Sequence, residues 1–185
     1  MPRFLSAVLA AALTCGCYAG TARDASVAGL EREGRWVLVK VPLVEQRGTS
    51  DCGTAALAAV LAYWGYPTSV SDVDRGIRRQ GGARASTADL ESYARARGLH
   101  AFTFFATIED LQHELDEGRP VIVGVAKPYT PGRARAHFEV VTGYEPGTSR
   151  ILTLDPARGA RSNELRGFLA EWEPTGRVAL VTAPP

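Results

Sequence analysis

The sequence is poor in the residues that bind metals. Only three cysteines and three histidines occur among its 185 residues. Zinc sites need clustered Cys, His or carboxylate ligands at characteristic spacings, and the scattered histidines of this chain show no such spacing. We therefore expect no metal ion and no other cofactor.

An excess of charge of one sign is also missing. The formal net charge is +1, whereas proteins that bind nucleic acid or anionic membranes carry a basic patch or a marked basic excess. Lysine is rare, because only Lys40 and Lys127 occur and the other basic residues are arginine. We therefore expect no nucleic-acid partner.

No apolar run is long enough to span a bilayer. The N-terminal run from Phe4 to Leu13 is interrupted only by Ser6 and falls short of the roughly 20 residues that a membrane helix needs. It follows the positively charged start Met1-Pro2-Arg3 and precedes small residues, which is the pattern of an export signal. We expect a signal peptide at 1–19, a Gly- and Ala-rich linker at 20–35 and one domain at 36–185.

The end of this signal allows two interpretations. Leu13-Thr14-Cys15-Gly16-Cys17 resembles a bacterial lipobox, in which the cysteine after a small residue receives lipid, so Cys17 is a candidate lipidation site. Ordinary cleavage after Ala19 is the alternative. Both place the domain outside the cytoplasm of a bacterium, either in the periplasm or anchored to the membrane by lipid, and the lipid would be its only membrane contact.

Cys52 is the only cysteine beyond this signal, so it has no disulfide partner within the domain. It precedes an apolar segment with helical spacing and therefore lies at an expected helix N-terminus. The free N–H groups and the dipole of a helix start favour a thiolate, and a neighbouring imidazolium lowers a thiol pKa to about 3.5–7.5. Cys52 is a candidate nucleophile; a buried structural cysteine is the alternative.

Gln46 lies one short loop upstream of Cys52, and Gly48, Thr49 and Ser50 belong to that loop. The loop could fold the Gln46 amide back beside the sulfur, where an oxyanion develops during acyl transfer. A merely solvated glutamine is the alternative. One segment thus offers both a nucleophile and an oxyanion donor.

Helices are expected mainly in the first half of the domain and strands mainly in the second. Apolar residues at helical spacing and cap residues predict helices at 51–64, from Ser69 or Ser71 to about 79, 87–98, 107–117 and 162–171. Runs of β-branched and alternating residues predict strands at 36–44, 99–105, 120–126, 137–144, 150–154 and 177–182. This order predicts an α+β domain with a helical lobe packed on an antiparallel sheet.

Two polar residues lie at the ends of neighbouring predicted strands. His137 opens one strand, and Asp155 follows the next in Asp155-Pro156. If the two strands form a hairpin around Pro146-Gly147-Thr148, His137 and Asp155 become neighbours. A carboxylate bonded to one ring nitrogen leaves the other to face a thiol, as in a catalytic triad. The alternative is a surface histidine and an ordinary Asp-Pro turn.

The segment Gln46 to Gly53, the strand beginning His137-Phe138 and the turn Asp155-Pro156 resemble the C39 peptidases, papain-like cysteine proteases that remove leader peptides from bacteriocin precursors. The resemblance implies a papain-like fold, with the nucleophile on the helical lobe and His and Asp on the sheet. It implies Cys52 as nucleophile, His137 as general base and acid, Asp155 as the residue that orients it, and Gln46 and the Cys52 N–H as oxyanion donors. The export signal indicates a stand-alone exported member.

We therefore expect a monomeric cysteine peptidase that cleaves a peptide or protein substrate outside the cytoplasm. An acyl or peptidyl transferase is the enzymatic alternative, since the same triad serves both reactions. An inactive exported peptide-binding module is a third hypothesis. The combination of Gln46, Cys52, His137 and Asp155 favours an enzyme, because folding alone does not require these residues.

The export signal makes a direct prediction about the mature N-terminus. Protein recovered from a bacterial host should begin at Cys17 carrying lipid, or near Gly20 without it. Intact-mass analysis separates the two. A soluble product that retains Met1 would contradict both interpretations.

Overall fold

The computed structural model describes residues 21–78, 85–130 and 133–185. Its centre is an eight-stranded sheet in the order β1-β7-β6-β5-β4-β8-β3, with β2 pairing with β5 beside this path. Every pairing is antiparallel. The strands are β1 (Arg23–Asp24), β2 (Val37–Leu38), β3 (His100–Phe105), β4 (Val121–Thr130), β5 (Arg133–Glu145), β6 (Arg150–Asp155), β7 (Gly159–Glu164) and β8 (Val178–Ala183).

Six α-helices accompany the sheet in the described part of the chain. They are α1 (Val27–Glu33), α2 (Cys52–Tyr63), α3 (Val70–Arg78), α4 (Thr87–Ala96), α5 (Ile108–Asp116) and α6 (Leu165–Trp172), which a 3-10 turn, Glu173–Thr175, follows. Capping boxes at Ser86 and Thr107 start α4 and α5, because each side chain accepts an otherwise unpaired N–H of the first turn. Within the described ranges no helix is both long and apolar enough to cross a membrane.

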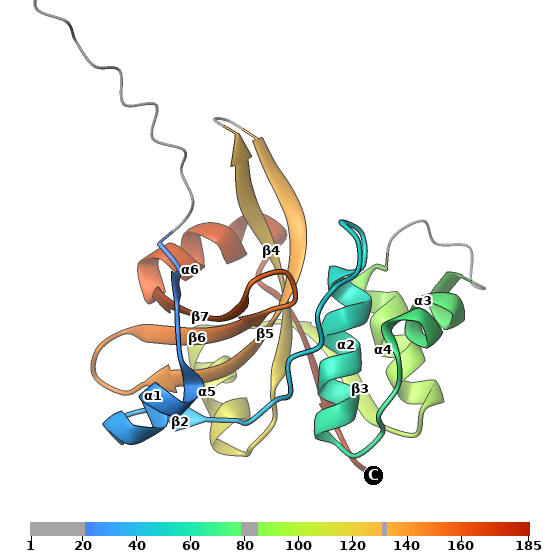
Figure 1. The fold of residues 1–185 in the computed structure, drawn as a ribbon, viewed down its shortest axis with the longest axis horizontal. Helices are drawn as coiled ribbons and strands as arrows, with labels where there is room; N and C mark the ends of the chain where they lie inside the picture. The colour runs from blue at the N-terminus through green and yellow to red at the C-terminus, as the bar shows by residue number, and fades with distance from the viewer. Residues whose placement is uncertain (1–20, 79–84, 131–132) are drawn as a thin grey trace, which may run out of the picture.

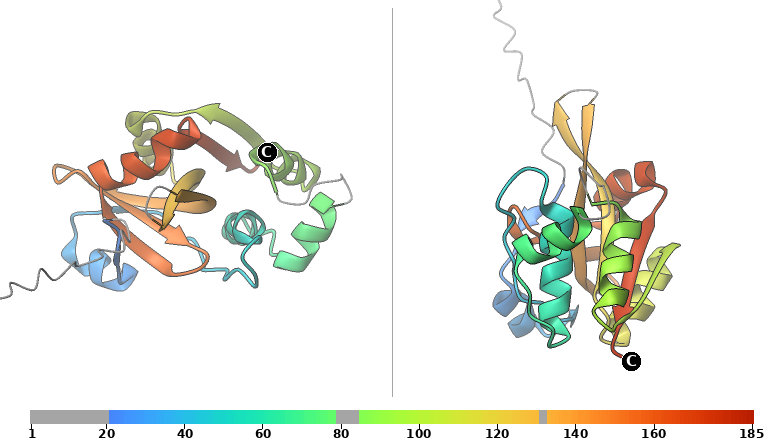
Figure 2. Two further views of the ribbon diagram at one scale, coloured as in Figure 1. Left: turned by 90° about the horizontal axis from the view of Figure 1, so that it is seen from above. Right: turned by 90° about the vertical axis from the view of Figure 1, so that its right-hand side faces the viewer.

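The two faces of the sheet are both covered. Neighbouring residues of one strand point to opposite faces, so Ile122 and Val140 pack with α2, α3 and α4, whereas Val121 and Val141 pack with α5 and α6. Figure 2 shows α2 and α6 on opposite sides of the β4–β5 hairpin. The predicted α+β fold with a helical lobe on an antiparallel sheet is confirmed, and α5 and α6 form a second helical layer.

Helix α2 is the centre of the helical lobe. All of its residues from Cys52 to Leu61 are buried, which explains why it is apolar all round rather than amphipathic. Neighbouring α3 and α4 contribute Val73, Ile77 and Leu90 to the same core. The N-terminus of α2 is thereby held in a fixed position against β5.

The segment predicted as a linker contains regular structure. Within 20–35, β1 pairs with β7, and α1 begins at a Ser26 side chain that accepts the Gly29 N–H. Gly34 ends the helix with a φ of 67°, a left-handed conformation that glycine adopts without strain. The helix has seven residues and buries only Leu30. One buried position gives no apolar periodicity, which is why the sequence did not predict this helix.

Two predicted elements have different bounds. The strand expected at 36–44 is reduced to β2. The Val39 N–H still donates to the Thr142 carbonyl at 2.8 Å, but the Val41 N–H turns back to the Val39 carbonyl at 3.0 Å and leaves the ladder. The helix expected at 162–171 begins at Leu165, since the residues before it form β7. Ser162 and Asn163 have low strand propensity but are buried in this strand, where pairing with β6 outweighs propensity.

The β4–β5 hairpin is longer than the sequence indicates. The strand expected to stop at 126 continues to Thr130, and the next begins at Arg133 instead of His137. The pairing becomes irregular between Pro128 and Thr130, and Figure 1 shows the hairpin projecting beyond the sheet. His137 therefore lies inside β5. The predicted signal and its Cys17 site lie outside the described residues.

A glycine at the β2–β5 crossing gives a test of this packing. A Cβ on Gly143 would lie 2.6 Å from the Val37 carbonyl oxygen, and backbone cannot move away cheaply. Gly143→Ala should therefore lower the free energy of unfolding by about 1–3 kcal/mol, as overpacking does. Gly124→Ala is the matched control, because its nearest neighbour is a Phe138 ring atom at an ordinary 3.7 Å. Equal melting temperatures for the two variants would contradict the packing described.

Candidate active site

Cys52 is the first residue of α2 and is 8% exposed. Its sulfur accepts hydrogen bonds from the backbone N–H groups of Phe138 and Gly53 and interacts with the His137 ring. The helix start therefore does bring N–H donors to the thiol, as the helix N-terminus argument expects. The thiol faces β5 across the boundary between helical lobe and sheet.

Close contact between α2 and β5 depends on Gly53. A Cβ at this position would lie 3.0 Å from a Phe138 ring carbon and 3.5 Å from the Ala85 Cβ. Any larger residue would force the Phe138 ring or the helix to shift, so glycine allows the helix start to approach the strand. Cys52 precedes Gly53 and His137 precedes Phe138, so the contact between Gly53 and Phe138 brings Cys52 and His137 together.

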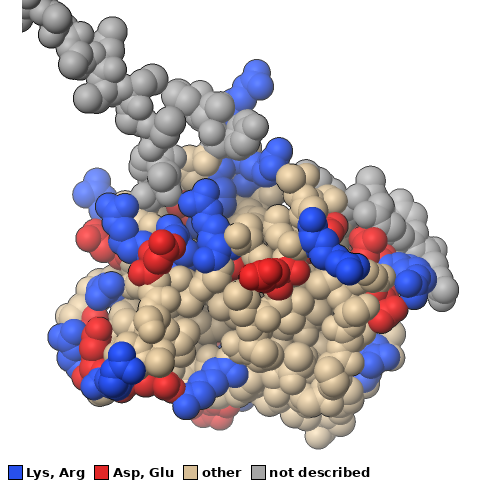
Figure 3. All heavy atoms as spheres, in the orientation of Figure 1, with Lys and Arg blue, Asp and Glu red and all other residues tan. Residues whose placement is uncertain are grey.

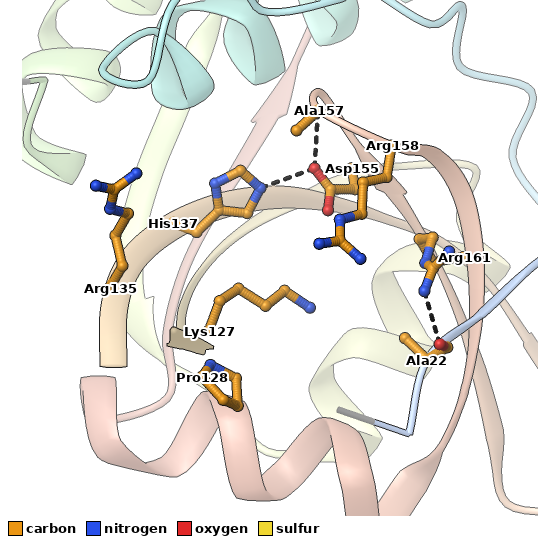
Figure 4. A pocket seen from close by; sticks show the side chains of 9 residues that line it. All are labelled: Ala22, Lys127, Pro128, Arg135, His137, Asp155, Ala157, Arg158 and Arg161. Carbon is orange, nitrogen blue, oxygen red and sulfur yellow. Dashed lines mark hydrogen bonds and ion pairs between the residues drawn. The ribbon is translucent and has the colours of Figure 1, made fainter. Parts of the chain in front are cut away.

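His137 and Asp155 are joined across neighbouring strands. The β5–β6 register pairs Val140 with Leu154, and the His137 Nε2 lies 2.8 Å from the Asp155 Oδ1. The same carboxylate oxygen accepts the Ala157 N–H at 2.8 Å, which fixes the carboxylate in place (Figure 4). The structure thus places the two residues side by side, as the predicted hairpin requires.

The His137 imidazole is protonated at neutral pH. Burial, the largest influence, lowers the pKa of His137, but the hydrogen bonds to Asp155 and Cys52 and the negative charges of Asp155 and Glu139 raise it to about 10. Because Nε2 faces Asp155, Nδ1 is the nitrogen left for the thiol. One ring thus bridges the carboxylate and the sulfur.

The Cys52 thiol has a lowered pKa. Burial, the largest influence, raises the pKa of this thiol, but the hydrogen bond and charge of His137, with the N–H groups of Phe138 and Gly53, bring it below its ordinary value. The pKa of Asp155 is likewise lowered, because its hydrogen bond to His137, the His137 charge, the Ala157 N–H and the Lys127 charge outweigh burial. These directions describe a thiolate–imidazolium pair supported by a carboxylate.

Three charged residues beside this pair, the half-buried Lys127 and the buried Glu139 and Glu171, were not predicted as site residues. Lys127 Nζ lies 2.7 Å from Glu139 Oε1 and 2.5 Å from Glu171 Oε2. The two carboxylates raise the pKa of Lys127 against the effect of burial, so the ammonium stays charged. Glu139 lies two residues after His137, on the same strand face, which was the one available signal. The distant Glu171 on α6 gave none.

His137, Glu139 and Asp155 could together hold a cation, since one possible ligand atom of each lies within 4.8 Å of the others. In this structure the Lys127 ammonium already contacts Glu139, and Asp155 accepts a hydrogen bond from His137. The donor set is thus engaged in protein contacts, and it gives little support to a resident metal ion.

Gln46 lies in the loop that leads to Cys52. Its backbone N–H donates to the Pro156 carbonyl at 3.0 Å, which ties this loop to the turn after Asp155. Its side-chain Nε2 donates to the Gly48 carbonyl at 2.9 Å, and its Oε1 is buried without a hydrogen-bond partner among the described residues. An amide has two N–H groups, so this contact engages one donor and leaves a second.

Two cavities adjoin Cys52, His137 and Asp155 without sharing a lining residue. One, of about 390 Å³, lies against Cys52 and is bordered by Thr49, Ser50, Ala136 and Phe138 among others. The other, of about 190 Å³, lies against His137 and Asp155 (Figure 4). Strand β5 separates them, because Ala136 and Phe138 border the first and His137 the second.

A cysteine at a buried helix start, facing a His–Asp pair on an antiparallel sheet, defines the papain-like class of cysteine peptidase. A family model described as the Peptidase_C39 like family matches residues 38–180. The chain belongs to this family and is a cysteine-type peptidase. A search of curated proteins finds no match.

Solved structures support this assignment. A double glycine motif protease from an AMS/PCAT transporter, in complex with its leader peptide, is 26% identical with a TM-score of 0.61, over 80% of this chain and 94% of that one. The peptidase domain of Streptococcus ComA, a bifunctional ABC transporter involved in quorum sensing, is 26% identical with a TM-score of 0.64, over 79% and 100%. The ComA domain of Streptococcus mutans, at 24% identity and a TM-score of 0.53 over 77% and 98%, shares the fold.

The lowered Cys52 pKa predicts fast alkylation at mildly acidic pH. Iodoacetamide should label Cys52 at pH 6 much faster than a small free thiol, because the thiolate persists below the pKa of about 8.5 of free cysteine. His137→Ala should move the rise in rate to higher pH, since burial then acts on the thiol without the imidazolium. Mass spectrometry of labelling time courses measures both. A wild-type profile that follows the free thiol would refute the ion pair.

Proposed function

We propose that this protein hydrolyses peptide bonds outside the cytoplasm through a Cys52–His137–Asp155 triad. The observation that supports the proposal most is the position of His137, which contacts the Cys52 thiol and bonds Asp155 at 2.8 Å. A buried imidazole with these two partners is the arrangement that activates a thiol for acyl transfer. The export pattern in residues 1–19 supports the location.

The reaction begins with the Cys52 thiolate attacking the carbonyl carbon of the scissile bond. The C–N bond then breaks as the electron pair of the tetrahedral oxyanion re-forms the carbonyl, and His137 Nδ1 gives its proton to the departing amine. This leaves a thioester on Cys52 and a neutral imidazole. His137 next takes a proton from water, whose oxygen displaces the thiolate and releases the carboxylic acid.

The oxyanion of both tetrahedral intermediates needs donors near the Cys52 sulfur. We assign this role to the second N–H of the Gln46 amide and to the Cys52 backbone N–H. The support is the position of Gln46 in the loop before α2, tied to Pro156 beside the triad. Preorganised donors of this kind are typically the largest single contribution to catalysis of acyl transfer.

The substrate we propose is a peptide or an unfolded segment of a protein. The leader peptide bound to the AMS/PCAT protease supports a peptide ligand for this fold. The cavity of about 390 Å³ beside Cys52 is within the size of ordinary small-ligand pockets and offers space for residues on the acyl side of the bond.

Mass spectrometry after incubation with a mixed peptide library tests the function directly. Hydrolysed peptides support the proposal, ligated peptides indicate an acyl transferase, and unchanged peptides indicate a binding module. Cys52→Ala is the control, because it removes the nucleophile and should abolish every product.

The role of Gln46 gives a separate prediction. Gln46→Ala should lower kcat by roughly 10²–10³, the usual loss for one oxyanion donor. Its melting temperature should barely change, because the exposed loop keeps its backbone bond to Pro156. Turnover and thermal unfolding are measured on the same protein. An unfolded variant, or one with full turnover, would rule out the assigned role.

Asp155→Asn provides the matched comparison. It should reduce kcat strongly because the imidazolium loses its charged partner and its fixed orientation, whereas an inactive binding module would keep its affinity through all of these changes.

A further inference from the structure

The cavity beside the His137–Asp155 pair is surrounded by basic side chains. Lys127, Arg135, Arg158 and Arg161 border it, and Asp155 is the one acidic residue among its lining residues. Figure 4 shows the Lys127 and Arg158 side chains projecting into the space next to His137 and Asp155, with Arg161 to the right of Arg158. Basic side chains also gather around the base of the β4–β5 hairpin on the surface (Figure 3).

The protein holds two of these cations in place, Lys127 and Arg161. Lys127 is held between the buried carboxylates of Glu139 and Glu171. These two negative charges balance its positive charge. The Arg161 side chain, 11% exposed, donates to the Ala22 carbonyl at 2.7 Å and pairs with Asp24, whose side chain is 90% exposed. In the part of the chain that the structure describes, Arg158 forms no ion pair. Arg158 therefore supplies donors that the folded chain does not use, and Arg161 has N–H groups beyond those that bind Ala22 and Asp24.

A carboxylate is the group that this set of donors fits. Guanidinium groups bind carboxylates through paired N–H donors in a planar fork, and such charge-assisted bonds are stronger than neutral ones. The volume of about 190 Å³ is below the range of drug-sized pockets. It suits one short side chain or a chain end.

The position of the cavity decides which part of a substrate it meets. During acyl transfer the acyl half is bonded to Cys52, while the leaving amine takes a proton from His137. Cys52 borders the cavity of about 390 Å³, and His137 borders the basic cavity of about 190 Å³. The half of the substrate that leaves with His137's proton therefore lies on the basic side.

We propose that this basic pocket binds a carboxylate on the leaving-group side of the scissile bond and makes the enzyme selective for substrates that carry one. The carboxylate is either an acidic side chain or the C-terminus of a short leaving peptide. The proposal rests on the proposed peptidase function and names a specificity of that same site.

Matched peptides distinguish these sources. A peptide cleaved in the library experiment is made with Glu or Gln at each of the first two leaving-group positions, and with a free or an amidated C-terminus at the same distances. The carboxylate forms should have kcat/KM values roughly 10-fold or more above the neutral forms, the effect of a hydrogen bond between charged groups. Selectivity for Glu indicates a side-chain site, and selectivity for the free acid indicates a C-terminal site.

Arginine variants locate the effect. Arg158→Gln and Arg161→Gln should each bring the ratio of carboxylate to neutral kcat/KM values towards one. Arg158 is exposed, so its variant tests the pocket even if Arg161→Gln disturbs the packing of Ala22. Arg97→Gln, an exposed change at the end of α4, is the control and should keep the wild-type ratio.

A binding measurement separates failure of the pocket from failure of the function. Dissociation constants of the same peptides are measured by calorimetry on the Cys52→Ala variant, with and without Arg158→Gln. Tighter binding of the carboxylate forms, lost with Arg158→Gln, supports the pocket even if the wild type cleaves nothing. Equal affinities, or cleavage without selectivity, overturn the pocket and leave the peptidase function standing.

Discussion

The contact between Gly53 and the Phe138 ring is the constraint on which the site depends. The Cys52 sulfur reaches His137 only because the start of α2 lies directly against β5, and a Cβ at residue 53 would already lie 3.0 Å from that ring. The residues of α2 from Cys52 to Leu61 are buried, and their packing in the core holds the helix in this position. The geometry of the Cys52–His137 contact thus follows from core packing, since rigid packing fixes the distance between the helix start and the strand.

Buried charge is the second organising feature. Glu139 and Glu171 are each 2% exposed, and burying either carboxylate alone would be costly. Lys127 forms an ion pair with both, and its charge also lowers the pKa of Asp155. One ammonium therefore connects α6 to the catalytic strands and keeps Glu139 engaged beside the imidazole. A substitution of Lys127 would leave unpaired carboxylates next to His137 and Asp155, so effects on folding and on the proposed triad could not be separated at this position.

The local sequence pattern was sufficient to predict the helix that carries the thiol and the two strands that carry the imidazole and the carboxylate. The apolar run after Cys52 and the hairpin between His137 and Asp155 are sequence-local features, so the helix and the cross-strand pair were predictable. Strand β7 was not, because Ser162 and Asn163 become strand residues only through pairing with β6. The partners of Lys127 were not predictable either, since Glu171 comes from a distant helix. The role of Gln46 as an oxyanion donor stays a prediction. One N–H of its amide donates to the Gly48 carbonyl, and the second is available for that role.

The burial of Lys127 has a practical consequence for labelling this protein. The chain has two lysines, and one of them is locked between two carboxylates with a raised pKa, which keeps its amine protonated and unreactive. Lys40, whose side chain is 74% exposed, is then the one readily acylated lysine. An amine-reactive dye or surface linker would attach to Lys40 and leave Lys127, next to Glu139 and Glu171, unmodified.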